Sequence, residues 1–288
     1  AVGGAEYDIL FGKVNPSAKL PETFPKQLED NPSYLAGFGE GDHVEYREGI
    51  FVGYRYYDKK KMDVLFPFGY GLSYTTFAYS NLCLDKKTMK DTEELTVSVD
   101  VTNTGDRAGK EVVQLYVADK ESTVIRPVKE LRDFVKIELA PGETKTVTFT
   151  LGKRAFAYYD VQIHDWQVET GEFEILIGAS SRDIALRDTV TVESTVKIPF
   201  HYTTDTTMGD IMSRPEAWKL VQSVLSKGMF GQGSEVNEGG DAAKEAISDE
   251  MNAAMLQYMP LRGPVSFGGG VSMADVQKLV DRLNAMEK

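Results

Sequence analysis

The chain has almost no cysteine and no long apolar run, and both shortages limit what it can be. Its 288 residues include one cysteine, Cys83, so an internal disulfide is impossible. No asparagine lies in an Asn-x-Ser/Thr sequence without proline in the middle, so no glycosylation acceptor is present. Both absences predict a reducing, cytoplasmic compartment. No stretch approaches the roughly 18 uninterrupted apolar residues that a membrane span needs.

Positive charge is also scarce. The chain has 32 Lys and Arg against 44 Asp and Glu, which gives a formal net charge of -12. Binding to phosphate backbones requires clustered Lys and Arg. The sequence therefore predicts no nucleic acid and no anionic membrane as a partner.

Metal-binding and phosphate-binding patterns are missing as well. His43, His164 and His201 lie far apart, and no His/Cys cluster has zinc spacing, so we expect neither a metal nor a cofactor. The glycines at 228–233 lack the preceding strand and the Lys-Ser/Thr ending of a phosphate loop. The glycines at 267–272 precede a predicted helix, where an anion could bind, although an ordinary turn is the favoured interpretation.

Three carboxylates near the aromatic segments could suggest the acid pair of a glycosidase. Glu40 lies in a polar Gly-Glu-Gly-Asp stretch and is expected to be solvated, and no catalytic role is expected for Glu45. For Glu48 we favour an anchoring role, through a hydrogen bond or a pairing with Arg47 or Arg55. The spacing of these residues indicates no reaction centre.

Two segments rich in aromatics and glycine, residues 46–57 and 66–77, are the most informative part of the chain. Aromatic rings bury large areas, and glycines let backbones approach closely. Their closeness in sequence predicts a packed junction between domains. The candidate interface residues are Tyr46, Glu48, Tyr54, Arg55, Phe68 and Tyr70.

Residues 1–76 are predicted to combine this junction with the C-terminal remnant of an α/β domain. Residues 5–11 read as the last turns of a helix that ends at Gly12. So short a helix is marginal without a surface to pack on, so we expect the chain to begin inside a domain whose earlier part is missing. Pro21 and Pro25 confine their segment to an edge strand or an extended arm.

Residues 77–197 have the pattern of an all-β domain. Apolar and polar residues alternate over 95–101 and again over 147–151, as in half-buried strands. About seven short strands separated by turns predict a two-sheet sandwich. The lack of a Cys-Trp-Cys framework favours the fibronectin III version. The other predicted strands contain Val113 to Val117, Val135 to Leu139, Trp166 to Val168, Phe173 to Ile177 and Val190 to Val192.

Residues 198–288 are predicted to form a helical extension. Ser213 begins a capping-box pattern before a first helix, residues 241–259 form a second helical region, and Ser272 opens a third. A polar loop at 228–240 separates the first two. We expect three helices joined by long loops to pack on the sandwich or on the missing part rather than alone. The predicted inner positions are Trp218, Val221, Val224, Leu225, Ala254, Met255, Met259, Val276, Leu279, Val280, Leu283 and Met286.

Three N-terminal motifs together resemble glycoside hydrolase family 3, the β-glucosidase family. Residues 12–25 read GKVNPSAKLPETFP, with Ala18 where the family has glycine. Residues 46–58 and 66–75 are similar to its Y-x-E-G-I-x-V-G-Y-R-Y-Y-D and F-P-F-G-Y-G-L-S-Y-T motifs. The similarity continues in order to about residue 190, through 101–105, 109–117, 126–132, 139–143 and 177–181. Residues 259–263 are similar to C-terminal extensions of some bacterial members.

This resemblance implies a mainly β chain: a fibronectin III-like β-sandwich preceded by the tail end of an α/β sandwich domain and followed by a helical C-terminal extension. It implies a parent retaining β-glucosidase that hydrolyses terminal non-reducing β-D-glycosyl residues. The family's nucleophilic Asp and acid/base Glu lie upstream of Ala1, so no catalytic residue is expected here and this chain alone is predicted to be inactive. The implied partners are the missing N-terminal catalytic part and, for the parent, a β-linked gluco-oligosaccharide or aryl glycoside.

Two other functions stay open from the residues alone. The chain could be a stand-alone fibronectin III-like carbohydrate-binding module, because fold by itself does not determine function. Carbohydrate platforms expose aromatics, however, and Trp166 reads as a core or edge residue. The chain could also be a structural spacer, although it has no tandem copies. Homo-oligomer formation and sugar specificity are not determined by the sequence.

Overall fold

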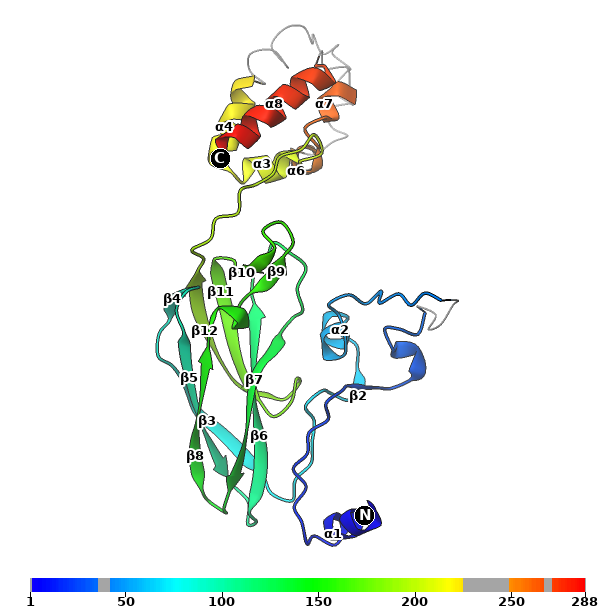
Figure 1. Cartoon of the computed structure of the whole chain (residues 1–288), viewed down its shortest axis with the longest axis vertical. Helices are drawn as coiled ribbons and strands as arrows, with labels where there is room; N and C mark the ends of the chain where they lie inside the picture. The colour runs from blue at the N-terminus through cyan, green and yellow to red at the C-terminus, as the bar shows by residue number, and fades with distance from the viewer. Residues whose placement is uncertain (1, 36–41, 225–248, 267–270, 288) are drawn as a thin grey trace. The chain divides into compact units, whose positions relative to one another are not determined.

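The computed structural model describes residues 2–35, 42–224, 249–266 and 271–287. The chain divides into two compact units, residues 1–197 and 198–288 (Figure 1). No helix in these described ranges is both long enough and apolar enough to cross a membrane.

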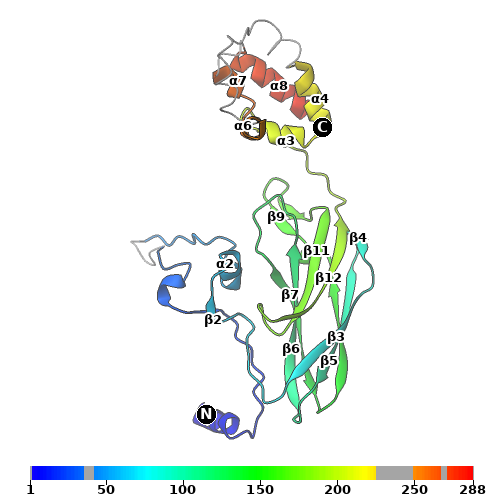
Figure 2. The same cartoon turned by 180° about the vertical axis from the view of Figure 1, so that it is seen from behind.

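The first unit contains a β-sandwich, which confirms the predicted mainly β, fibronectin III-like class (Figures 1 and 2). One sheet has the strand order β4-β12-β11-β6-β7 and the other β3-β5-β8. Neighbouring strands pair antiparallel except β12 and β4, which are parallel. The strands are β3 (Phe77–Leu84), β4 (Thr88–Lys90), β5 (Leu95–Asn103), β6 (Gly109–Asp119), β7 (Glu130–Leu139), β8 (Thr144–Leu151), β11 (Gly171–Gly178) and β12 (Ile184–Glu193); β9 (Tyr158–Asp160) and β10 (Asp165–Gln167) form a separate hairpin.

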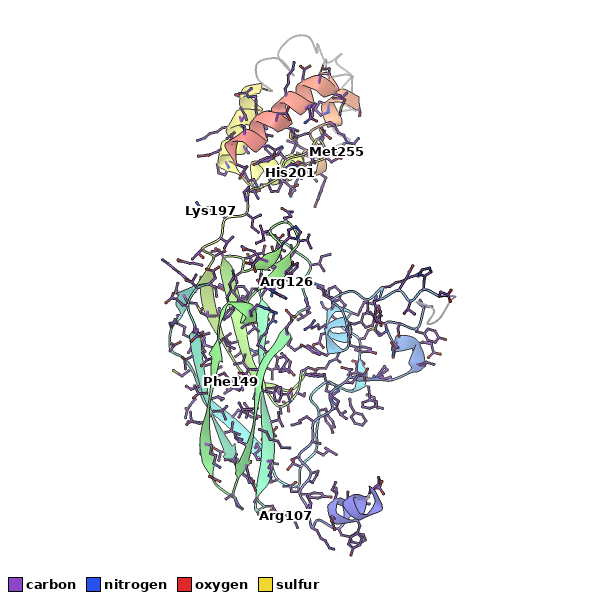
Figure 3. The ribbon with its side chains drawn as sticks, in the orientation of Figure 1. Arg107, Arg126, Phe149, Lys197, His201 and Met255 are labelled. Atoms are coloured by element: carbon purple, nitrogen blue, oxygen red, sulfur yellow. The ribbon has the colours of Figure 1, made fainter. Side chains whose placement is uncertain are left out.

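The core of the sandwich follows from the alternation in β5. Leu95, Val97, Val99 and Val101 are all fully buried, and the residues between them are half-buried. β8 pairs in register, so that Phe149 lies opposite Val97 and also points into the core (Figure 3). Period-two alternation places every second side chain on one face, which is why this pattern predicted the strands correctly.

Within residues 77–197 the prediction missed β3, β4 and β9. In β3 the register shifts between Ser80 and Cys83, and Asn81 has a φ of 52°. An irregular strand loses strict alternation, because the extra residue turns the following side chains to the opposite face. β4 has only three residues, too few for a periodic signal.

The N-terminal residues form short elements rather than a layer. Helix α1 (Val2–Leu10) ends as predicted at Gly12, whose φ is +70° and whose N–H donates to the Ile9 carbonyl at 2.9 Å. Strand β1 (Phe24–Pro25) pairs only with β2 (Val64–Phe66), which confirms the edge strand at Pro25. The remaining elements are the 3-10 helix η1 (Leu28–Asp30) and α2 (Tyr54–Lys59).

The second unit closes a core of its own, so the expectation that its helices do not form an independent unit was wrong. It contains α3 (Met208–Met212), α4 (Pro215–Val224), α6 (Asp249–Tyr258), α7 (Gly263–Ser266) and α8 (Met273–Met286). Several residues of this core lie outside the three predicted helices. Helical periodicity therefore could not predict that they are buried. Its buried hydrophobic residues are Tyr202, Met208, Ile211, Ala217, Val221, Leu261, Val276, Leu279, Val280 and Leu283.

Several details of the helical prediction change. The Ser272 capping box is confirmed, with Asp275 as its partner. The capping box at Ser213 was wrong: Ser213 ends α3, and its hydroxyl donates to the Asp210 carbonyl at 2.7 Å. Trp218 is half-buried against the core, whereas Ala254, Met255 and Met286 are exposed, contrary to prediction. Some of the predicted features lie outside the described residues. These are the Val224 side chain, Leu225, the loop at 228–240, residues 241–248 and most of the turn at 267–272.

Candidate domain interface

Tyr54 joins the N-terminal segment to the outer face of the five-stranded sheet. Its ring is 9% exposed, stacks on Phe68 with centroids 4.8 Å apart, and meets the edge of Tyr116 at 6.1 Å. Its hydroxyl accepts a hydrogen bond from the Leu131 N–H at 2.8 Å. One side chain thus ties α2 to both β6 and β7, beside which α2 lies in Figure 1.

A buried polar chain extends this contact. Tyr116 donates to the Gln114 side-chain oxygen at 2.6 Å, and the Gln114 amide donates to the carbonyls of Gly69, at 3.1 Å, and Ala179, at 2.7 Å. Burial raises the pKa of Tyr116, so its hydroxyl stays a donor. A Cβ on Gly69 would collide with Gln114, and its φ is +79°. The glycine motif therefore allows this close backbone approach.

Ion pairs surround the same contact. The Asp58 carboxylate, 8% exposed, pairs with Lys129 at 2.6 Å and Arg182 at 3.2 Å. Arg55 pairs with Glu130 on β7 at 3.1 Å. These pairs are partly removed from water, so losing one partner would leave a buried charge uncompensated.

The predicted pairing of Glu48 was wrong. Arg55 pairs with Glu130, and Arg47 pairs with Glu45 at 2.5 Å on the surface. Glu48 is half-buried and forms no ion pair within the described residues. Glu130 lies 75 or more positions away in sequence from either arginine, so only the fold could place it.

The six candidate residues divide into two groups. Tyr54, Arg55 and Phe68 come together on the sandwich, as described above. Tyr46 is 78% exposed, and the Tyr70 ring stacks on Phe66 with centroids 5.2 Å apart. The sequence reasoning missed Asp58, Gln114, Tyr116 and Glu130; a polar Gln114 between apolar strand neighbours was the available signal.

Residues 1–76 leave most of their apolar side chains uncovered. Their only buried hydrophobic residues in the described part are Tyr54 and Tyr57, and α1 has no buried residue at all. Apolar surface exposed to this extent is typical of a segment that packs against another surface. The exposed large hydrophobic residues are Val2, Tyr7, Ile9, Leu10, Phe11, Val14, Phe24, Leu28, Tyr34, Leu35, Val44, Tyr46, Ile50, Val52, Leu65, Phe66, Leu72 and Tyr74.

The described part of the chain gives no sign that the carboxylates considered for catalysis act as an acid pair. Glu45 is exposed and bound to Arg47, and Glu40 lies outside the described residues. Within the described ranges, no three or more His, Cys, Asp or Glu side chains are grouped to hold a metal ion.

Comparison with known proteins identifies both parts of the first unit. Residues 1–74 match the glycosyl hydrolase family 3 C-terminal domain, and residues 111–181 match the fibronectin type III-like domain. The chain belongs to glycoside hydrolase family 3, where it corresponds to the C-terminal region of β-glucosidases.

Individual relatives agree with this assignment. The chain is 52% identical over its whole length to thermostable β-glucosidase B of Acetivibrio thermocellus, covering 37% of that protein. It is 45% identical over 230 residues to an exo-α-(1→6)-L-arabinopyranosidase of Bifidobacterium breve, covering 80% of this chain and 30% of that protein. The crystal structure of a Bifidobacterium adolescentis family 3 β-glucosidase has a TM-score of 0.68 at 43% identity, over 76% of this chain and 32% of that one. The chain thus spans about a third of the length of these relatives.

Proposed function

We propose that this chain works as the C-terminal part of a retaining β-glucosidase that releases terminal non-reducing β-D-glycosyl residues. The uncovered apolar surface of residues 1–76 carries this proposal: it is the surface expected of a segment that packs against further domains. The partner is the N-terminal catalytic part, which supplies both carboxylates. The substrate of the whole enzyme is a β-linked gluco-oligosaccharide or an aryl glycoside.

In this proposal the chain braces the catalytic domains. Tyr54, Arg55 and Phe68 fasten the N-terminal segment to the sandwich, and Tyr46, Glu48 and Tyr70 face the upstream domains. The rigid sandwich core then supports that surface without taking part in the chemistry.

A complementation experiment tests the proposal. The purified chain is assayed on an aryl β-glucoside alone and after mixing with A. thermocellus β-glucosidase B truncated to lack the homologous region. We expect no turnover by either piece and recovered turnover by the mixture. Hydrolysis by the chain alone, or no recovery together with no association of the two pieces, would overturn it.

The alternative of a stand-alone binding module has its own test. A pull-down on cellulose should retain none of the chain if it is a brace, whereas a cellulose-binding module would be retained.

The source and location belong to the same proposal. The match along the whole chain to a bacterial relative supports a bacterial source, and the exposed thiol of Cys83 is suited to a reducing cytoplasm. Cell fractionation checks the location. A homo-oligomer is a further possibility, which sedimentation velocity of the complete enzyme would decide.

A further inference from the structure

A groove of about 580 Å³ opens beside the β9–β10 hairpin of the sandwich. The segment 124–127, the hairpin and residues of α2 and β7 line it, and Arg126 marks its position in Figure 3. Its lining combines four arginines, three aromatic rings and two carboxylates, those of Glu130 and Asp160. The bracing contacts described above use only its Arg55–Glu130 edge.

Positive charge is in excess in this groove. Glu130 is shared by Arg55 at 3.1 Å, Arg132 at 2.6 Å and Arg126 at 3.7 Å, and Arg126 also pairs with Asp119 at 2.9 Å. Three guanidinium groups thus share two carboxylates. The buried Nε of Arg132 has no hydrogen-bond partner in the described part of the chain. Buried hydrogen-bond donors in proteins are normally paired, so an unsatisfied one here is unusual.

A fourth arginine carries no counter-charge. The Arg154 guanidinium lies over the Trp166 ring, 3.4 Å from its centroid, and forms no ion pair or hydrogen bond with any described residue. Stacking holds the guanidinium plane, so its N–H groups remain free for a carboxylate or phosphate. In a chain of net charge -12, such a local excess of cations favours an anionic ligand.

The remaining lining suits a sugar ring. Tyr159 is 49% exposed and meets the edge of Trp166 at 5.5 Å, so it offers an aromatic surface to the C–H face of a pyranose. Tyr158 donates to Asp160 at 3.5 Å. Burial, followed by the nearby Glu169 and Asp160, raises the pKa of Tyr158 to about 12, so the hydroxyl remains a donor at neutral pH. Asp160 is an acceptor for sugar hydroxyls.

We propose that this groove binds an anionic sugar, a pyranose that bears a carboxylate or phosphate. Arg154 contacts the anion, Arg132 adds positive charge nearby, and Tyr159 packs against the ring. The inference does not depend on the proposed glycosidase function.

Calorimetric titration of the full chain separates the contribution of the anionic group to binding from that of the sugar ring. The probes are methyl β-D-glucuronide and glucose 6-phosphate, with methyl β-D-glucoside as the neutral sugar and acetate and inorganic phosphate as bare anions. Charge-assisted hydrogen bonds predict that at least one acidic sugar binds about tenfold or more tightly than the neutral sugar and than its matching bare anion. The acidic sugar that binds identifies the anion. Equal binding of neutral and acidic sugar, equal binding of the bare anion, or no binding of either acidic sugar would overturn the proposal.

Matched arginine variants locate the site. Arg154→Gln should weaken binding of the acidic sugar by about tenfold and leave binding of the neutral sugar unchanged. Arg154→Lys should have an intermediate effect, because lysine lacks the planar guanidinium fork. Arg107→Gln removes another exposed arginine, at the opposite end of the sandwich (Figure 3), and should change neither affinity. Tyr159→Ala should weaken the binding of both sugars. Since Arg154 is exposed and, among the described residues, its guanidinium forms no ion pair or hydrogen bond and stacks on Trp166, its variants should keep the unfolding temperature of the parent chain. Unchanged affinity in Arg154→Gln would refute the assignment.

Discussion

The sandwich and residues 1–76 use similar apolar and aromatic side chains in opposite ways. Within the sandwich, Leu95 and Phe149 are at most 1% exposed, and the two sheets cover each other. In residues 1–76, Leu10 is 76% exposed and Leu35 is 90% exposed. An apolar residue is buried only when the same chain provides a surface to cover it. The comparison therefore teaches where this chain covers its own apolar side chains and where it leaves them exposed.

The reason lies in the size of the elements. Long paired strands such as β5 and β6 form faces broad enough to bury each other. β1 and β2 have two and three residues, and α1 and α2 are short helices. Such pieces cannot enclose a core. They are attached to the sandwich by contacts that include those around Tyr54 and Asp58 and the Lys19–Glu111 ion pair at 2.8 Å.

The largest expected effect uses the same substitution in both regions. Leu95→Ala should lower the free energy of unfolding by about 2–5 kcal/mol, because it leaves a cavity in the core. Leu10→Ala should change it by less than about 0.5 kcal/mol, because that side chain is already in water. Urea unfolding of the two variants measures both values. Similar losses in the two would break the comparison.

An intermediate effect is expected where the two regions meet. Tyr54→Phe removes the acceptor for the Leu131 N–H and should cost about 1–3 kcal/mol. Tyr56→Phe is the control, since the Tyr56 hydroxyl forms no hydrogen bond with a described residue. Thermal unfolding, together with proteolysis of residues 1–76, is the measurement. If the two variants behave alike, the hydroxyl of Tyr54 does not hold the junction.

The smallest effect tests whether the helical unit resembles the sandwich in being self-contained. Ser272→Ala removes the cap of α8 and should cost about 1 kcal/mol in the helical transition alone. A simultaneous loss in the sandwich transition would mean that the units do not fold independently. Circular dichroism at helix and strand wavelengths separates the two.

The same cap predicts a pH dependence. The Ser272 hydroxyl and N–H donate to Asp275 and hold the pKa of that carboxyl below its ordinary value of 3.8. Because the pKa of Asp275 is lowered in the folded state, its ionised carboxylate stabilises the helix above pH 3.8. This contribution is lost as the pH falls below that value. In Ser272→Ala the loss of helix stability on acidification should therefore be smaller than in the parent chain. An unchanged acid profile would contradict this explanation.

Much of the architecture was readable in advance because it depends on neighbours in sequence. The alternation in β5 and β8, the Gly12 helix end and the Ser272 cap each involve residues a few positions apart. The irregular β3 and the three-residue β4 were missed because neither has a regular period. The division into residues 1–76, 77–197 and 198–288 remains a prediction, as does the role of the six candidate residues in contacts with upstream domains.

By itself the sequence determined the strands with strict alternation, the helix end at Gly12, the Ser272 cap and the family to which the chain belongs. Only the tertiary structure decided that Arg55 pairs with Glu130, that Tyr54 rests on Tyr116, and that the helical unit closes its own core. It also gathered four arginines beside Trp166. Local patterns set which face of an element is apolar, whereas partners come from distant segments that meet only when the sheets close.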